Sequence, residues 1–137
     1  MMYAQNKAAQ YRAVSGQGLV MDASPARLVQ IMFEHVVSLL ATAQGCMERI
    51  QGNLPLHEVK TKGAAVGKAV RLINQLDASL DMERGGEIAQ NLRNLYAYIL
   101  NRLTAANVTN DPAIVAEVIS LVRTVKLGWD KIVPDAR

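Results

Sequence analysis

Two histidines, His35 and His57, and one cysteine, Cys46, are the side chains of this sequence best suited to catalysis or metal binding. No cysteine cluster and no Glu-x-x-His motif accompanies them, so the sequence favours neither a zinc site nor a di-metal centre. Cys46 falls at a core-type position without an obvious base, which favours a buried thiol over a nucleophile. His35, beside Glu34, is interpreted as a rim or core residue. The sequence therefore predicts no metal and no cofactor.

His57 has one possible catalytic role. In "LHEVKTKGAAVGKA" it stands three residues before Lys60, and small residues follow. This stretch resembles the phosphoacceptor motif of histidine phosphotransfer bundles, where an exposed mid-helix histidine lies beside a lysine and a glycine. Here Thr61 follows Lys60, and His57 lies two residues after Pro55, at a helix start. A polar first turn is the favoured interpretation, and phosphotransfer through His57 is the enzyme-class alternative.

The composition predicts one folded helical domain. Half of the 137 residues are hydrophobic and a fifth are charged, while aromatic residues are few. The net charge of +3 is spread along the chain rather than clustered, which disfavours nucleic-acid binding. A lone cysteine indicates a reducing compartment. Because neither a secretory signal nor an apolar run of about 18 residues is seen, we expect a cytoplasmic chain that does not insert into a membrane.

Apolar residues at steps of three and four predict a first long helix over residues 25–51. Ser24 can accept a hydrogen bond from a first-turn amide, and Pro25 suits the first helical position. Besides the main seam, a second apolar edge predicts that this helix has neighbours on two sides. That second edge consists of Val29, Phe33, Leu40 and Met47.

The same period predicts three further helices. The second spans about residues 56–81, and "ERGGE", residues 83–87, is expected to be a turn. The third helix runs to about Asn107, and Asp111-Pro112 begins the last, which Pro134 stops. Gly63 and Gly67, among alanines of the second helix, favour close packing of two bundle helices.

Four long helices with short connections predict an all-α fold, an antiparallel up-down-up-down four-helix bundle. The bundle is expected to span residues 24–133 as a single domain, with a tail over 134–137. Residues 1–23 are expected to form an N-terminal cap segment and tether, with a short, weaker helix over about 3–14. From the residues alone, the chain is interpreted as a binding module without a catalytic centre.

Three stretches resemble the flagellin export chaperone family. They are "MYAQNKAAQY", with Tyr3 and Tyr11; "ASPARLVQIMFEHV"; and "GGEIAQNLRNLYAYILNRLTAAN". Trp129 and Ile132 near the end also fit the family pattern. The chain departs from that pattern at Glu34 and His35, where Asp and Gly are common.

This resemblance implies an antiparallel bundle with an N-terminal cap and no catalysis or cofactor. It also implies a cytoplasmic chaperone that binds the C-terminal segment of flagellin, prevents premature polymerisation and delivers flagellin to the flagellar type III export apparatus. We expect the apolar edges of the second and third helices to form the groove. The expected neighbours of the bound segment are Val66, Ile73, Leu80, Leu92, Tyr96, Ile99 and Leu103. Tyr3, Tyr11, Leu19 and Val20 are expected to cover part of this surface or to contact the ligand.

Two alternatives stay open beside the chaperone. One is the phosphotransfer bundle that uses His57, and the other is a scaffold bundle for another flagellar or regulatory protein. The sequence allows either a monomer or a weak homodimer.

Overall fold

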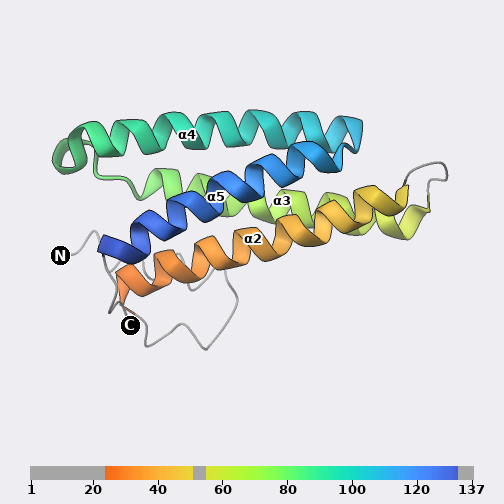
Figure 1. The fold of residues 1–137 in the computed structure, drawn as a ribbon, viewed down its shortest axis with the longest axis horizontal. Coiled ribbons are helices and arrows are strands. Elements are labelled where there is room, and N and C mark those ends of the chain that lie inside the picture. The colour runs from red at the N-terminus through yellow and green to blue at the C-terminus, as the bar shows by residue number, and fades with distance from the viewer. Residues whose placement is uncertain (1–23, 51–54, 133–137) are drawn as a thin grey trace.

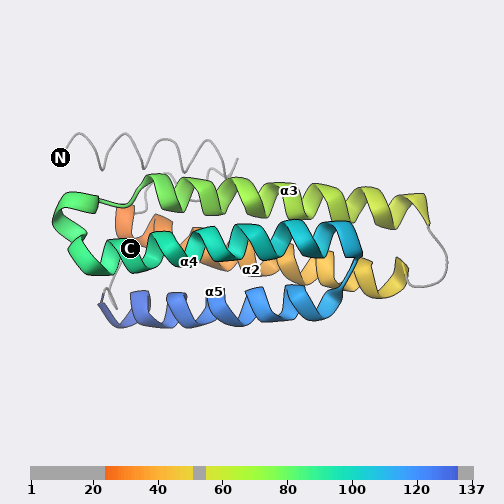
Figure 2. The same ribbon diagram turned by 90° about the horizontal axis from the view of Figure 1, so that it is seen from above.

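A computed structural model describes residues 24–50 and 55–132 of the chain. It contains four helices, α2 (Pro25–Ile50), α3 (Leu56–Ala78), α4 (Met82–Thr109) and α5 (Pro112–Ile132). The direction of the chain reverses from each helix to the next (Figure 1). The helices pack in the ring order α2–α3–α4–α5, with α5 closing against α2 (Figure 2). The predicted all-α, up-down-up-down bundle is confirmed, and no strand occurs among the described residues. The predicted N-terminal cap lies outside them.

The predicted starts of α2 and α5 are confirmed by their capping contacts. At α2, the backbone N–H of Arg27 donates to Ser24 Oγ at 3.1 Å. At α5, the backbone N–H of Ala113 donates to Asp111 Oδ1 at 2.9 Å. In each case a proline follows the capping residue and needs no amide partner. These two contacts fix where α2 and α5 enter the bundle.

The junction between α3 and α4 differs from the prediction. The α3 helix ends at Ala78 rather than near residue 81, and α4 begins at Met82 rather than after a turn over residues 83–87. The reason is Asp81, whose Oδ1 accepts from the backbone N–H groups of Glu83 at 3.2 Å and Arg84 at 3.0 Å. One helical turn therefore forms before Gly86, where the backbone leaves helical geometry at φ 51° and ψ −128°.

The far end of α4 also extends past its predicted end near Asn107. The helix continues to Thr109, and Asn110 takes a left-handed conformation with φ 53°. Its backbone N–H donates to the Ala106 carbonyl at 2.8 Å, which is the usual way to close a helix C-terminus. Asn110 therefore stands alone between the end of α4 and Asp111, which caps α5.

The core runs along the bundle axis and is built from aliphatic side chains of all four helices, as the composition predicts. The α2 helix has the most extensive contacts, with α3 and α5, whereas α4 contacts its neighbours less. Both predicted apolar edges of α2 are used, since Phe33, Leu40 and Met47 are buried and Val29 packs against the core. Among the described helices, α4 therefore has the least extensive contacts with its neighbours.

The interpretation of Gly63 as a close-packing residue is wrong. Gly63 is exposed, and a Cβ placed on it would meet nothing within 4 Å. A Cβ on Gly67 would meet only the Arg71 side chain, at 3.7 Å. Gly63 lies on the outer side of α3 and Gly67 is half-buried, whereas the buried side of the helix is formed by other residues, among them Val66, Leu72 and Leu76.

Candidate functional site

An apolar cleft of about 600 Å³ lies at the end of the bundle where α2 and α4 begin and α5 ends. Its volume falls within the range of about 300–1,000 Å³ that is typical of ligand pockets. The α4 and α5 helices are joined by a short turn at the opposite end and diverge toward the cleft (Figure 1). The lining residues are Pro25, Ala26, Val29, Phe33, Leu76, Ser79, Leu80, Asp81, Gly85, Ile88, Ala89, Leu92, Tyr96, Thr124, Val125, Gly128 and Trp129.

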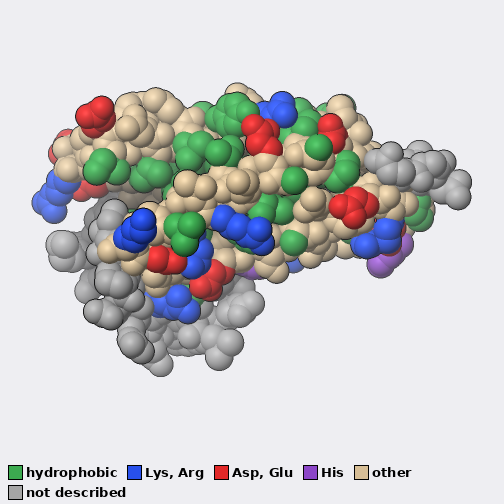
Figure 3. Space-filling model, viewed as in Figure 1, with side chains coloured by type: hydrophobic (Ala, Val, Ile, Leu, Met, Phe, Trp, Pro, Cys, Tyr) green, Lys and Arg blue, Asp and Glu red, His purple; other side chains and the backbone are tan. Residues whose placement is uncertain are grey.

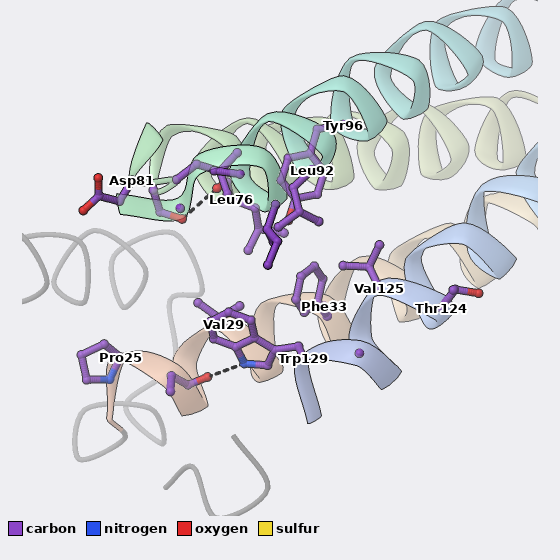
Figure 4. A pocket seen from close by; sticks show the side chains of 17 residues that line it. Pro25, Val29, Phe33, Leu76, Asp81, Leu92, Tyr96, Thr124, Val125 and Trp129 are labelled. Carbon is purple, nitrogen blue, oxygen red and sulfur yellow. Dashed lines mark hydrogen bonds between the residues drawn. The ribbon is translucent and has the colours of Figure 1, made fainter. Parts of the chain in front are cut away.

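Two walls face each other across this cleft. Leu92 and Tyr96 of α4 point toward Phe33 and Val29 of α2, and Trp129 of α5 lies beside Val29 (Figure 4). Phe33 and Tyr96 are 2% and 3% exposed, so they form the floor where the cleft meets the core. The half-buried Val29, Leu92 and Trp129 form the sides. The inner end of the cleft is therefore lined by side chains that also belong to the core.

At the mouth of the cleft, Ile88 of α4 is 68% exposed. On the face seen in Figure 3, hydrophobic side chains gather over α4 and along its border with α5. Ile88 extends the apolar lining of the cleft to the outer surface, and a contiguous apolar patch of this kind is typical of a surface that binds another protein.

The wall formed by α2 and α5 is held together by a polar network. The Trp129 indole N–H donates to the Ala26 carbonyl at 3.1 Å, and Gln30 Nε2 donates to Asp130 Oδ1 at 2.7 Å. Lys126 Nζ donates to Asp130 Oδ2 at 2.7 Å. The ammonium of Lys126, with the amide of Gln30, lowers the pKa of the Asp130 carboxyl. These bonds orient Trp129 and hold α5 against α2 on this side of the cleft.

The opposite wall is attached to α3. Arg93 Nε of α4 donates to Asp77 Oδ1 at 3.2 Å, and Arg93 Nη2 donates to the Asp77 carbonyl at 3.5 Å. A cation at the C-terminal end of α3 also interacts favourably with the helix dipole. The cleft therefore lies between two pairs of helices, α2 with α5 and α3 with α4, each joined by its own polar contacts.

The cleft is almost entirely apolar. Among its described lining residues, Asp81 alone carries a charged side chain, and its Oδ1 accepts two backbone N–H groups of α4. Nearly all of the other lining residues lie on helices, so most of their backbone N–H and C=O groups are satisfied by hydrogen bonds within those helices. A ligand that fits must present apolar side chains, because it finds few polar groups to pair with.

The residues first considered for catalysis lie away from this cleft. His57 is exposed in the first turn of α3, at the opposite end of the bundle. Cys46 is 1% exposed, and burial raises the pKa of its thiol, with Glu58 adding to the effect. His35 is half-buried on α2. Within residues 24–50 and 55–132, no three His, Cys, Asp or Glu side chains converge as a metal site would require.

One described helix, α2, is long and apolar enough to cross a membrane by length and composition. Its apolar side chains are those of the bundle core, and the helix also carries Arg27 and Glu34 on its surface. The apolar character of α2 is explained by core packing.

The predicted contact residues divide into three groups. Leu80, Leu92 and Tyr96 line the cleft. Val66 is 4% exposed, and Ile73, Ile99 and Leu103 are fully buried, so these four belong to the core and do not line the groove. Their positions share the helical period of the groove residues, but they lie where the neighbouring helices close over them. Tyr3, Tyr11, Leu19 and Val20 lie outside the described residues.

The sequence prediction missed the half of the cleft that comes from α2 and α5. Val29 and Phe33 line it from α2, and Val125 and Trp129 from α5. A signal for the first two existed, because they form the second apolar edge of the first helix. The sequence pattern did not distinguish Val125, which lines the cleft, from the other valines on the apolar side of α5, which are buried in the core.

Comparison with known proteins places these features in a family. The sequence model described as "Flagellar protein FliS" matches residues 6–136 of the chain. This chain belongs to the FliS family. It is 44% identical over 131 residues to the flagellar secretion chaperone FliSB of Pseudomonas aeruginosa, which covers 96% of this chain and 98% of that protein.

Other FliS relatives are similar over nearly the whole chain. The flagellar secretion chaperone FliS of Salmonella typhimurium is 40% identical over 98% of this chain and 96% of its own. The FliS of Vibrio cholerae is 38% identical over 91% of this chain and 87% of its own. The family predicted from the three sequence stretches is confirmed. These FliS relatives are named as chaperones rather than as enzymes.

Proposed function

We propose that this protein is a cytosolic export chaperone that binds the disordered C-terminal segment of flagellin, prevents its premature polymerisation and delivers it to the flagellar type III export apparatus. The observation that carries the proposal is the apolar cleft between α4 and the α2–α5 pair, in a chain whose relatives are named flagellar secretion chaperones. An export substrate must stay unfolded until secretion, and an apolar cleft can cover the side chains that would otherwise associate.

The cleft favours a ligand that binds as an amphipathic helix. An extended segment would leave its backbone N–H and C=O groups unpaired against apolar walls, whereas a helix satisfies them internally. Ile88, Leu92 and Tyr96 follow one another at steps of four along α4, which extends over about 12 Å at 1.5 Å per residue. This length suits two or three apolar anchors of a docked helix. Ordering a disordered segment opposes binding, so further contacts outside the cleft are expected.

The partner contacts that we propose are Leu80 and Leu92 on one wall, Val29 and Trp129 on the other, and Tyr96 at the floor. The buried Val66, Ile73, Ile99 and Leu103 support the walls from inside the core. Tyr3, Tyr11, Leu19 and Val20 keep their predicted role as a cover of the groove or as direct contacts.

Isothermal titration of the full chain with a purified C-terminal fragment of flagellin from the same organism tests the proposal. We expect saturable binding of one fragment per chain and a negative heat-capacity change, because apolar surface is buried. The matched control is a flagellin fragment that lacks the C-terminal segment. Absence of binding at high micromolar concentration contradicts the proposal.

A deletion of residues 1–20 assigns the role of the N-terminal segment in the same titration. Tighter binding indicates that the segment competes for the groove as a lid. Weaker or lost binding indicates that Tyr3, Tyr11, Leu19 or Val20 contacts the ligand.

A further inference from the structure

Three glycines, Gly85, Gly86 and Gly128, lie in or beside the cleft, and two of them are explained by the fold itself. A Cβ on Gly85 would lie 2.6 Å from the Ala89 Cβ, closer than two carbons can approach. Gly86 has a φ of 51° with a ψ of −128°, a conformation that is essentially restricted to glycine. Both residues are therefore required by the local backbone of α4.

The local backbone of α5 does not require a glycine at Gly128. Among the described residues, a Cβ placed there would meet nothing within 4 Å, and the backbone of Gly128 does not have a positive φ. The helix continues to Ile132, so Gly128 does not terminate it. Glycine is the poorest helix former after proline, which makes its presence within α5 unfavourable for the isolated chain.

The place of Gly128 in the cleft supplies a reason. The residues of α5 that line the cleft are Thr124, Val125, Gly128 and Trp129, which form one continuous stripe at helical spacing. Gly128 is the only one of these four without a side chain, so the stripe has a gap beside the Trp129 indole. The hydrogen bond from that indole to the Ala26 carbonyl holds the ring in place, so the ring is not free to fill the gap.

We propose that Gly128 determines which ligands the cleft accepts, by letting the backbone of the bound segment approach α5 closely. Because Gly128 has no side chain, the backbone of the bound helix passes close to α5 at this point. Its apolar side chains then contact Val29 and Leu92. This inference rests on the proposed function, since it concerns the flagellin segment in the same cleft. An open glycine alone does not carry it, because Gly63 is equally open but lies outside the cleft.

The test is titration of the flagellin C-terminal fragment into Gly128→Ala and Gly128→Leu, with Gly63→Leu as the matched control. At both positions a β-carbon would meet nothing within 4 Å among the described residues, and replacing a helical glycine raises helix propensity. We therefore expect thermal unfolding temperatures at or above that of the unmodified protein. Gly128→Leu should weaken binding by about tenfold or more, Gly128→Ala by a smaller factor, and Gly63→Leu should leave binding unchanged.

The outcomes separate the two proposals. If the unmodified chain does not bind the fragment, the proposed function fails. If the unmodified chain binds and Gly128→Leu binds equally well or more tightly, only the role of Gly128 is overturned. An equal loss in Gly63→Leu also overturns it, because the effect would then not belong to the cleft.

Discussion

The two ends of the bundle are built from the same helices and differ in how completely they close. At the closed end, where α3 and α5 begin, Leu103, Ala106 and Val115 are fully buried. There, Lys62 Nζ donates to the Asn107 carbonyl at 2.9 Å and ties α3 to the last turns of α4. At the open end, where α2 and α4 begin, the corresponding space is the apolar cleft.

The same apolar period along the helices therefore forms a closed core at one end and an open apolar cleft at the other. The closed end has a tight connection, because only Asn110 and Asp111 lie between the end of α4 at Thr109 and the start of α5 at Pro112. The open end has the backbone break at Gly86, and α4 diverges from α5 on the way to it (Figure 1). We therefore expect substitutions at the closed end to change mainly the free energy of unfolding, and those at the open end to change mainly the affinity for the ligand.

The largest effect on stability is expected from Leu103→Ala at the closed end. Removal of a fully buried leucine side chain should lower the free energy of unfolding by about 2–5 kcal/mol. Urea unfolding followed by circular dichroism measures this change. A loss below about 1 kcal/mol would show that the closed end is loosely packed and would remove the contrast with the cleft.

Gly86→Ala should have the next largest effect. A β-carbon at φ 51° and ψ −128° is strained, so the substitution should lower the free energy of unfolding by about 1–3 kcal/mol. Gly63→Ala is the control, because an exposed helical glycine should gain stability from the same change, by up to about 1 kcal/mol. If both variants gained stability, the break in α4 would not be a fixed feature of the open end.

Leu92→Ala tests the open end directly. Leu92 lines the cleft and is half-buried, so its truncation should cost less stability than that of Leu103. Binding of the flagellin C-terminal fragment should weaken about tenfold, or about 1.4 kcal/mol, measured by isothermal titration. Unchanged affinity would contradict the assignment of this wall to the ligand.

The smallest effect is expected from Glu117→Gln, on the surface between α4 and α5. Glu117 accepts from the Tyr98 hydroxyl at 2.6 Å and from Arg102 Nε at 2.9 Å, and these two bonds lower its pKa from the ordinary value of 4.5. Since the pKa is lower in the folded state, the stabilisation is complete above pH 4.5 and is lost as the pH falls further.

Unfolding of both proteins as a function of pH measures this contribution. The stability difference between the original protein and Glu117→Gln should be largest near neutral pH and should shrink as the solution becomes acidic. A difference that stays constant through the acid range would show that the carboxylate charge is not responsible.

Much of the fold could be predicted from local signals. Ser24-Pro25 and Asp111-Pro112 each combine a capping oxygen with a proline, and both contacts are present in the structure. The α3–α4 junction was predicted in part. The backbone does break within "ERGGE", at Gly86, but Asp81 caps a helical turn ahead of that break, which the prediction missed. A side-chain cap of this kind competes with turn propensity, and the sequence alone does not decide between them.

The candidate site was less accessible from the sequence, for a physical reason. Leu103 and Leu92 occupy equivalent positions in the pattern of α4, yet Leu103 is fully buried and Leu92 lines the cleft. What separates them is the distance of α4 from α5 at each level, which the period of one helix does not encode. The contribution of Val29 and Phe33 was indicated by the second apolar edge of α2, whereas that of Val125 depends entirely on how the helices are placed.

The position of Trp129 also makes the cleft observable by spectroscopy. It is the only tryptophan in the sequence, and it stands in the cleft wall with its indole N–H bonded to the Ala26 carbonyl. An apolar segment that enters the cleft would remove water from the exposed part of this ring while the hydrogen bond keeps the ring in place. Emission of the unlabelled protein, excited at a wavelength that tryptophan absorbs and tyrosine does not, therefore reports on the open end, with no contribution from a second indole in the chain.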